Sequence, residues 1–145
     1  MKRHPALIPV SREHHDSLIL ARLLQKDAPP YKGLPVEIDG KAAYALEFYK
    51  NKLIAHFIAE EKILPLVKGL NSEIDVLITE ILEEHDRFHI SFNSINTQDN
   101  LADHLDKLGK DLELHVRKEE RQLFPLIQEN CSEQVLNTIE MILSD

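Results

Sequence analysis

The stretch HFIAEEKILPL, residues 56–66, returns near the end of the chain as HVRKEERQLFPL, residues 115–126. Each copy begins with a His, carries a Glu four residues later and a second Glu directly after it, and ends with a Pro-Leu pair. Residues four apart lie on one face of an α-helix, so each copy can direct a nitrogen and an oxygen toward the same point. We therefore predict two facing metal-binding pairs, His56 with Glu60 and His115 with Glu119.

A third pair of this kind, His85 with His89, lies between the two copies. All three pairs lie on stretches whose apolar residues recur every three or four positions, which is typical of helices that pack in a bundle. The predicted helices run from about residue 11 to 26, 41 to 69, 72 to 95 and 101 to 126, and a shorter one begins near Ser132. Residues 1–10, with two prolines, are predicted to form an irregular arm.

No useful length of sequence alternates in the manner of a β-strand. Four long amphipathic helices joined mostly by short turns favour an all-α fold, an up-down-up-down antiparallel four-helix bundle with a short C-terminal helix. The longest connection is the proline-rich segment 28–35.

The composition fits one domain spanning residues 1–145, with 43% hydrophobic residues and a net charge of -8. Nucleic acids and anionic membranes attract clustered Lys and Arg, so this charge disfavours both as partners. The single Cys131 cannot form an internal disulfide, and no segment approaches the ~20 apolar residues of a membrane span. We therefore expect a cytoplasmic protein that binds neither nucleic acid nor membrane.

The paired His and Glu residues fall near the middle of their helices, where the core would otherwise be apolar. Burying several imidazoles and carboxylates without partners costs several kcal/mol, on the order of the net stability of a domain. The pattern therefore predicts that cations lie among them. A metal-free bundle that acts only as an interaction module is the alternative that this cost disfavours.

The chain resembles the hemerythrin family, and in particular its HHE cation-binding branch. The resemblance rests on the EHH sequence of the first helix, on His56 with Glu60, on His85 with His89, and on His115 with Glu119. It implies one hemerythrin-like domain holding two non-haem iron ions joined by an oxo or hydroxo bridge. Five histidines and two bridging carboxylates would hold the irons, and one position would stay open for dioxygen. The implied ligands are His15, His56, Glu60, His85, His89, His115 and Glu119.

The first-helix ligand rests on a choice between two neighbours. The averaged apolar direction of the helix lies nearer His15 than His14, and Leu18 and Ile19 follow His15 by three and four residues. We therefore assign His15, with His14 as the alternative, either solvated or donating to another residue. Glu61 and Glu120 lie about 100° around the helix from the predicted ligands, which favours solvated positions. For Glu61 a role as an additional or exchangeable ligand is the alternative.

In the family's oxygen carriers the last carboxylate is an Asp five residues after its His, whereas here Glu119 follows His115 by four, as in the HHE branch. That branch is associated with sensing of oxygen or iron, with nitric oxide responses and with iron handling. The resemblance therefore implies a protein that binds dioxygen or another small diatomic ligand, or senses oxygen, nitric oxide or iron, rather than an enzyme. Any signal would pass to a separate partner protein. The alternative is a diiron oxidoreductase that turns over peroxide or nitric oxide at the same site.

Overall fold

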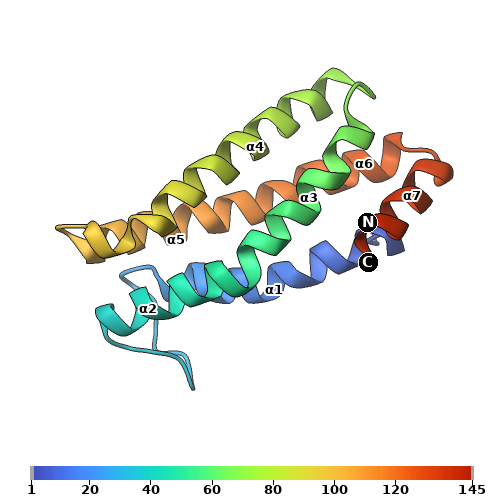
Figure 1. The fold of residues 1–145 in the computed structure, drawn as a ribbon. Helices are drawn as coiled ribbons and strands as arrows, with labels where there is room; N and C mark the ends of the chain where they lie inside the picture. Colours follow the sequence, from blue (N-terminus) through green and yellow to red (C-terminus); the bar gives the residue numbers. More distant parts are fainter. Residues whose placement is uncertain (1, 145) are drawn as a thin grey trace.

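The computed structural model describes residues 2–144, and every regular element among them is helical. Four long helical columns run antiparallel (Figure 1). The first is α1 (Ile8–Leu23), and the second joins α2 (Ile38–Phe48) to α3 (Ile54–Val67). The third is α4 (Ser72–Asn93), and the fourth joins α5 (Leu101–Lys118) to α6 (Phe124–Asn130). The short α7 (Glu133–Leu143) follows, which confirms the predicted bundle with a C-terminal helix.

Two short π-helical segments interrupt the second and fourth columns. They are η2 (Tyr49–Leu53), between α2 and α3, and η4 (Glu119–Leu123), between α5 and α6. In such segments the backbone hydrogen bonds join residues five apart instead of four, and these segments are frequent at functional sites. Two 3₁₀ turns complete the elements, η1 (Pro5–Leu7) before α1 and η3 (Ile95–Thr97) after α4.

Polar side chains cap the N-termini of three helices. Asn71 accepts a hydrogen bond from the backbone N–H of Ile74 at the start of α4, and Asn100 accepts one from Asp103 at the start of α5. Ser132 caps α7 by accepting a hydrogen bond from the backbone N–H of Val135. These caps satisfy backbone donors that the first turn of a helix leaves free.

The irregular arm predicted for residues 1–10 is wrong for its second half. Pro5 and Pro9 lie in the first turns of η1 and α1. Backbone N–H groups in a first turn have no acceptor within the helix, so proline, which lacks this N–H, is tolerated there. The helical column therefore begins before Ser11, and Ala6, Leu7 and Val10 are buried in the core.

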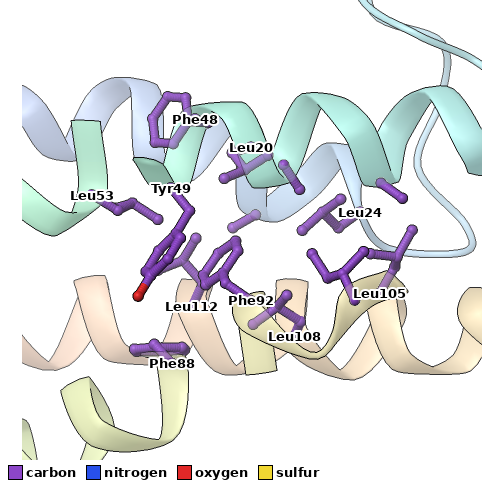
Figure 2. Close-up of a cluster of buried hydrophobic side chains, with 14 of the residues drawn as sticks. Leu20, Leu24, Phe48, Tyr49, Leu53, Phe88, Phe92, Leu105, Leu108 and Leu112 are labelled. Atoms are coloured by element: carbon purple, nitrogen blue, oxygen red, sulfur yellow. The ribbon is translucent and has the colours of Figure 1, made fainter. Parts of the chain in front are cut away.

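The core is divided into two apolar clusters that occupy opposite halves of the bundle. One cluster, drawn in Figure 2, includes Leu20, Tyr49, Phe92 and Leu108, with the Tyr49 and Phe92 rings stacked at 4.8 Å. The other includes residues of η1, α6 and α7, at the end of the bundle where the described chain starts and finishes (Figure 1). No helix within residues 2–144 is long and apolar enough to cross a membrane.

Candidate metal centre

Six ionisable side chains lie between the two apolar clusters, and none is more than 4% exposed. One comes from α1, two from the second column, one from α4 and two from the fourth column, so every column contributes. Each occupies a core position of its helix, with apolar neighbours one or two turns away on either side. These residues, which we call the central cluster, are His14, His56, Glu60, His85, His115 and Glu119.

Each carboxylate of the central cluster extends between two imidazoles on opposite sides. Glu60 places Oε1 3.1 Å from Nε2 of His85 and Oε2 3.3 Å from Nε2 of His56. Glu119 places Oε1 2.8 Å from Nε2 of His14 and Oε2 3.6 Å from Nε2 of His115. The ligand atoms therefore form two groups that share both carboxylates, one with His14 and His56 and the other with His85 and His115.

The other ring nitrogen, Nδ1, of each of these histidines meets a carboxylate outside the central cluster. The Nδ1 distances are 2.6 Å from His14 to Glu120, 2.9 Å from His56 to Glu13, 2.8 Å from His85 to Glu61 and 2.7 Å from His115 to Glu84. Each histidine is thus held by the column that precedes its own, and the first column by the last, in a closed ring. A carboxylate on Nδ1 sets the tautomer that leaves Nε2 free as a metal ligand.

The π-helical segment η4 positions Glu120 in this ring. In η4 the N–H of Phe124 bonds to the carbonyl of Glu119, and Pro125 has no N–H to offer. The carbonyl of Glu120 instead accepts a hydrogen bond from Arg3 at 2.9 Å, and its Oε1 accepts another at 3.1 Å. The start of the chain therefore holds the carboxylate that orients His14.

The pKa values of the central cluster show the effect of so many charges in a buried space. Burial alone would lower the pKa of His14, but the carboxylates of Glu119, Glu120 and Glu60 outweigh it and raise that pKa to about 12. Burial likewise lowers the pKa of His56, yet Glu60 and Glu13 raise it to about 10. Without metal, His14 and His56 therefore hold protons as a countercharge to the carboxylates.

Five atoms of the central cluster have no hydrogen-bond partner among the described residues. Although His14 Nε2 and Glu119 Oε1 are 2.8 Å apart, they are not aligned for a hydrogen bond. Leaving buried polar atoms unpaired costs roughly 1–3 kcal/mol each, so a structure retains them where something else satisfies them. Cations between the imidazoles and carboxylates would do so. The unpaired atoms are His14 Nε2, His56 Nε2, Glu60 Oε2, His115 Nε2 and Glu119 Oε1.

The structure brings together five of the seven residues assigned from the sequence, but the first-helix assignment needs correction. His14 lies in the central cluster at 2% exposure, whereas His15 is exposed to solvent. The buried face of α1 includes Val10, His14 and Ser17, which follow one another at steps of four and three. The predicted helix begins at Ser11 and therefore leaves out Val10, the buried residue that marks this face.

His89 is also outside the central cluster and belongs to neither group of ligand atoms. Its Nδ1 lies 2.5 Å from the hydroxyl oxygen of Tyr49, in the apolar cluster of Figure 2, and it is half-buried. One turn along α4 from His85 moves it toward that cluster rather than toward the carboxylates. The pair predicted from His85 and His89 therefore supplies one central residue instead of two.

The sequence reasoning missed the roles of four carboxylates. The sequence predicts solvated positions for Glu61 and Glu120 and no histidine contact for Glu13 or Glu84, whereas all four lie against Nδ1 of a histidine. A signal was present in the pairs Glu13-His14, Glu60-Glu61, Glu84-His85 and Glu119-Glu120, which place an extra Glu beside a core residue in every column. The pKa of Glu84 reflects its contact with a histidine. Burial alone would raise this pKa, but His115 and Lys118 lower it to about 2.

Comparison with known proteins gives an independent result for the fold and the site. The family model described as the hemerythrin HHE cation binding domain matches residues 9–127. This range holds all six residues of the central cluster and the four outer carboxylates. No curated protein and no solved structure shows a significant match to the chain.

Proposed function

Because the chain belongs to the hemerythrin HHE cation-binding family, we propose that its central cluster holds two non-haem iron ions and binds dioxygen or another small diatomic ligand. The observation that carries this proposal is the sharing of both Glu60 and Glu119 between two imidazole pairs. A single cation would not use both oxygens of each carboxylate in this way, whereas a pair of cations would.

The division of ligands follows from the two groups of atoms. His14 and His56 would hold one metal ion, His85 and His115 the other, and the two carboxylates would bridge them. Imidazole and carboxylate donors without thiolate suit iron or manganese, and carboxylate-bridged dimetal sites are an established use of four-helix bundles. Each imidazole would bind through Nε2, because its Nδ1 faces an outer carboxylate.

Aromatic rings surround the central cluster and limit the access of water. The ring of Phe57 stacks on His85 at 4.2 Å, Phe88 meets His115 edge-on at 5.1 Å, and Phe124 stacks on His14 at 5.8 Å. A reduced iron pair supplies electrons and open coordination positions for a diatomic ligand. The surrounding rings would shield that ligand from water and hold the imidazoles in place.

The decisive experiment is iron quantification with absorption spectra of the reduced and the air-exposed protein. We expect two irons per chain and a visible absorption band that appears with dioxygen and disappears on its removal. Iron well below one per chain, with no loss of stability after chelation, would instead indicate a metal-free bundle. A diiron protein without a reversible adduct would leave sensing of iron or nitric oxide as its function.

A second candidate, a diiron oxidoreductase, is favoured by one observation. Since His89 lies outside the central cluster, the protein would supply four imidazoles rather than five, which would leave one more metal position open. An additional open position suits a substrate as well as a diatomic ligand. Turnover of peroxide or nitric oxide far above that of free iron would identify the protein as an enzyme.

A further inference from the structure

A cavity of about 570 Å³ lies between α4 and α5 and extends to η4. Its inner wall includes Phe88, Glu84 and His115, and its outer wall includes Arg87, from α4, and Arg121, from η4. The cavity is open to solvent along one side. We call it the α4–α5 groove.

The α4–α5 groove is basic, although the protein as a whole carries a net charge of -8. Only two acidic residues, Glu84 and Asp111, are among the residues that line it. The field inside a cleft follows its nearest charges, so the groove attracts anions that the rest of the surface repels. The five basic residues of its lining are Arg87, Lys107, Arg117, Lys118 and Arg121.

Two of these cations have no internal countercharge. Lys107 pairs with Asp111 and Arg117 with Glu113, and Lys118 bonds to Glu80 and Glu84. Arg87 and Arg121, in contrast, form no ion pair or hydrogen bond through their guanidinium groups with any residue between 2 and 144. Both face the groove from different columns. A guanidinium group binds a carboxylate or phosphate group through two parallel N–H donors, so each of these two residues can hold an anion in the groove.

The groove also has an apolar surface. Leu114 is 67% exposed, whereas Leu105, Leu108 and Leu112 of the same helix are buried, and Phe88 also belongs to the lining. The cavity volume falls within the roughly 300–1,000 Å³ of small-molecule sites, which combine apolar walls with a few polar groups.

We propose that the α4–α5 groove binds a small organic anion, a carboxylate or phosphate ester with an apolar body, between Arg87 and Arg121 and against Leu114. The anionic group contacts the two guanidinium groups, and the apolar body covers Leu114. Binding of this anion does not require metal at the central cluster.

The groove is connected to the central cluster by two hydrogen bonds. Lys118 donates to Glu84 Oε2 at 2.5 Å, and Glu84 Oε1 lies 2.7 Å from Nδ1 of His115. An anion in the groove also attracts Lys118 and weakens its contact with Glu84. Occupation of the groove therefore changes the hydrogen bond that orients His115, a consequence that rests on the proposed function.

Isothermal titration calorimetry of the isolated protein at low ionic strength tests the proposal with four probes. They are phenyl phosphate, benzoate, inorganic phosphate and the uncharged benzyl alcohol. We expect one molecule of phenyl phosphate or benzoate per chain, weaker binding of inorganic phosphate, no binding of benzyl alcohol, and loss of affinity as salt is added. The phosphate and carboxylate probes distinguish which anionic group the groove prefers.

The double variant Arg87→Gln/Arg121→Gln should bind the aromatic anions at least about tenfold more weakly, since it loses both charge-assisted contacts. The control Lys32→Gln/Lys68→Gln removes the same charge from exposed positions outside the groove and should bind like the unaltered protein. Equal affinity of the two double variants would overturn the proposal, as would binding that disappears when metal is removed. If the protein takes up no iron but still binds phenyl phosphate in the groove, only the proposed function fails.

Discussion

Glu120 lies 2.6 Å from Nδ1 of His14, although the two residues are 106 positions apart in the chain. This contact closes the ring in which each column of the bundle orients the histidine of another. It also connects the central cluster to the start of the chain, because Arg3 bonds to both the side chain and the carbonyl of Glu120. The ring makes the geometry of the central cluster a property of all four columns together.

Substitution of Glu120 by Gln should weaken metal retention without unfolding the protein. Loss of a carboxylate that orients a ligating histidine typically costs about 10- to 100-fold in metal affinity. Competition with a chelator of known affinity measures this change. Glu129→Gln, an exposed position on α6 without an ion pair, is the matched control and should retain iron like the unaltered protein. Identical retention by both variants would contradict the role of Glu120.

Arg3 should act through Glu120. Arg3→Met removes the hydrogen bonds to Glu120 and Gln128 but preserves an apolar side chain against Phe124. We expect faster iron loss to chelator than in the unaltered protein and slower loss than in Glu120→Gln. If Arg3 only stabilised the fold, the free energy of unfolding of the metal-free protein would fall while the rate of iron loss stayed constant.

The neighbouring residues His14 and His15 provide a direct comparison. His14→Ala removes an Nε2 from the central cluster and should reduce the iron bound per chain, whereas His15→Ala alters an exposed side chain and should not. His89→Asn should also leave the iron content unchanged, because His89 contacts Tyr49 rather than the carboxylates. Elemental analysis of the three purified variants decides the matter. Loss of iron in His15→Ala but not in His14→Ala would reverse the assignment.

Much of this site was predictable from sequence, and the failures have identifiable causes. The spacing of His56 with Glu60 and of His115 with Glu119 places both members on one helix face, which periodicity predicts. Periodicity could not reveal that Tyr49 binds His89, or that Glu61 bonds to His85 on α4, because both are contacts between columns. The sequence favours His15 over His14 because the predicted helix lacks its first turn, residues 8–10, which shows that the buried face includes His14.

The metal-free protein should lose stability as the pH rises from about 6.5 to 10 and beyond. The pKa values of His14 and His56 are raised in the fold, to about 12 and about 10, so their stabilisation is complete below the unfolded value of 6.5 and is lost as the pH rises through the folded values. Glu84, whose pKa is lowered to about 2, acts at the acid side: its contribution is lost as the pH falls from about 4.5 toward 2.

Urea denaturation between pH 4 and pH 10 measures this dependence. The midpoint for the metal-free protein should be highest near pH 5 to 6 and fall toward pH 10, while that of the iron-loaded protein should rise or stay level above pH 6, because metal ligation requires unprotonated imidazoles. A metal-free protein whose midpoint increases up to pH 10 would show that His14 and His56 are not protonated in the fold.

Substitution of Gly109 by Ala tests how closely α1 packs against α5. A methyl group at this position would lie 2.5 Å from the carbonyl oxygen of Ala21 and 3.0 Å from Cβ of Leu24. Alanine improves helix propensity by about 1 kcal/mol, but overpacking against backbone typically costs about 1–3 kcal/mol. We therefore expect Gly109→Ala to lower the free energy of unfolding, as measured with urea. A more stable variant would show that the two helices can separate without cost.

The location of the metal ions tests the central claim most directly. In a crystal of the iron-loaded protein, an anomalous difference map at the iron absorption edge should show two peaks in the central cluster. One should lie beside Nε2 of His14 and His56 and the other beside Nε2 of His85 and His115, with Glu60 and Glu119 reaching both. A single peak, or peaks elsewhere on the molecule, would contradict the assignment of this cluster as a dimetal site.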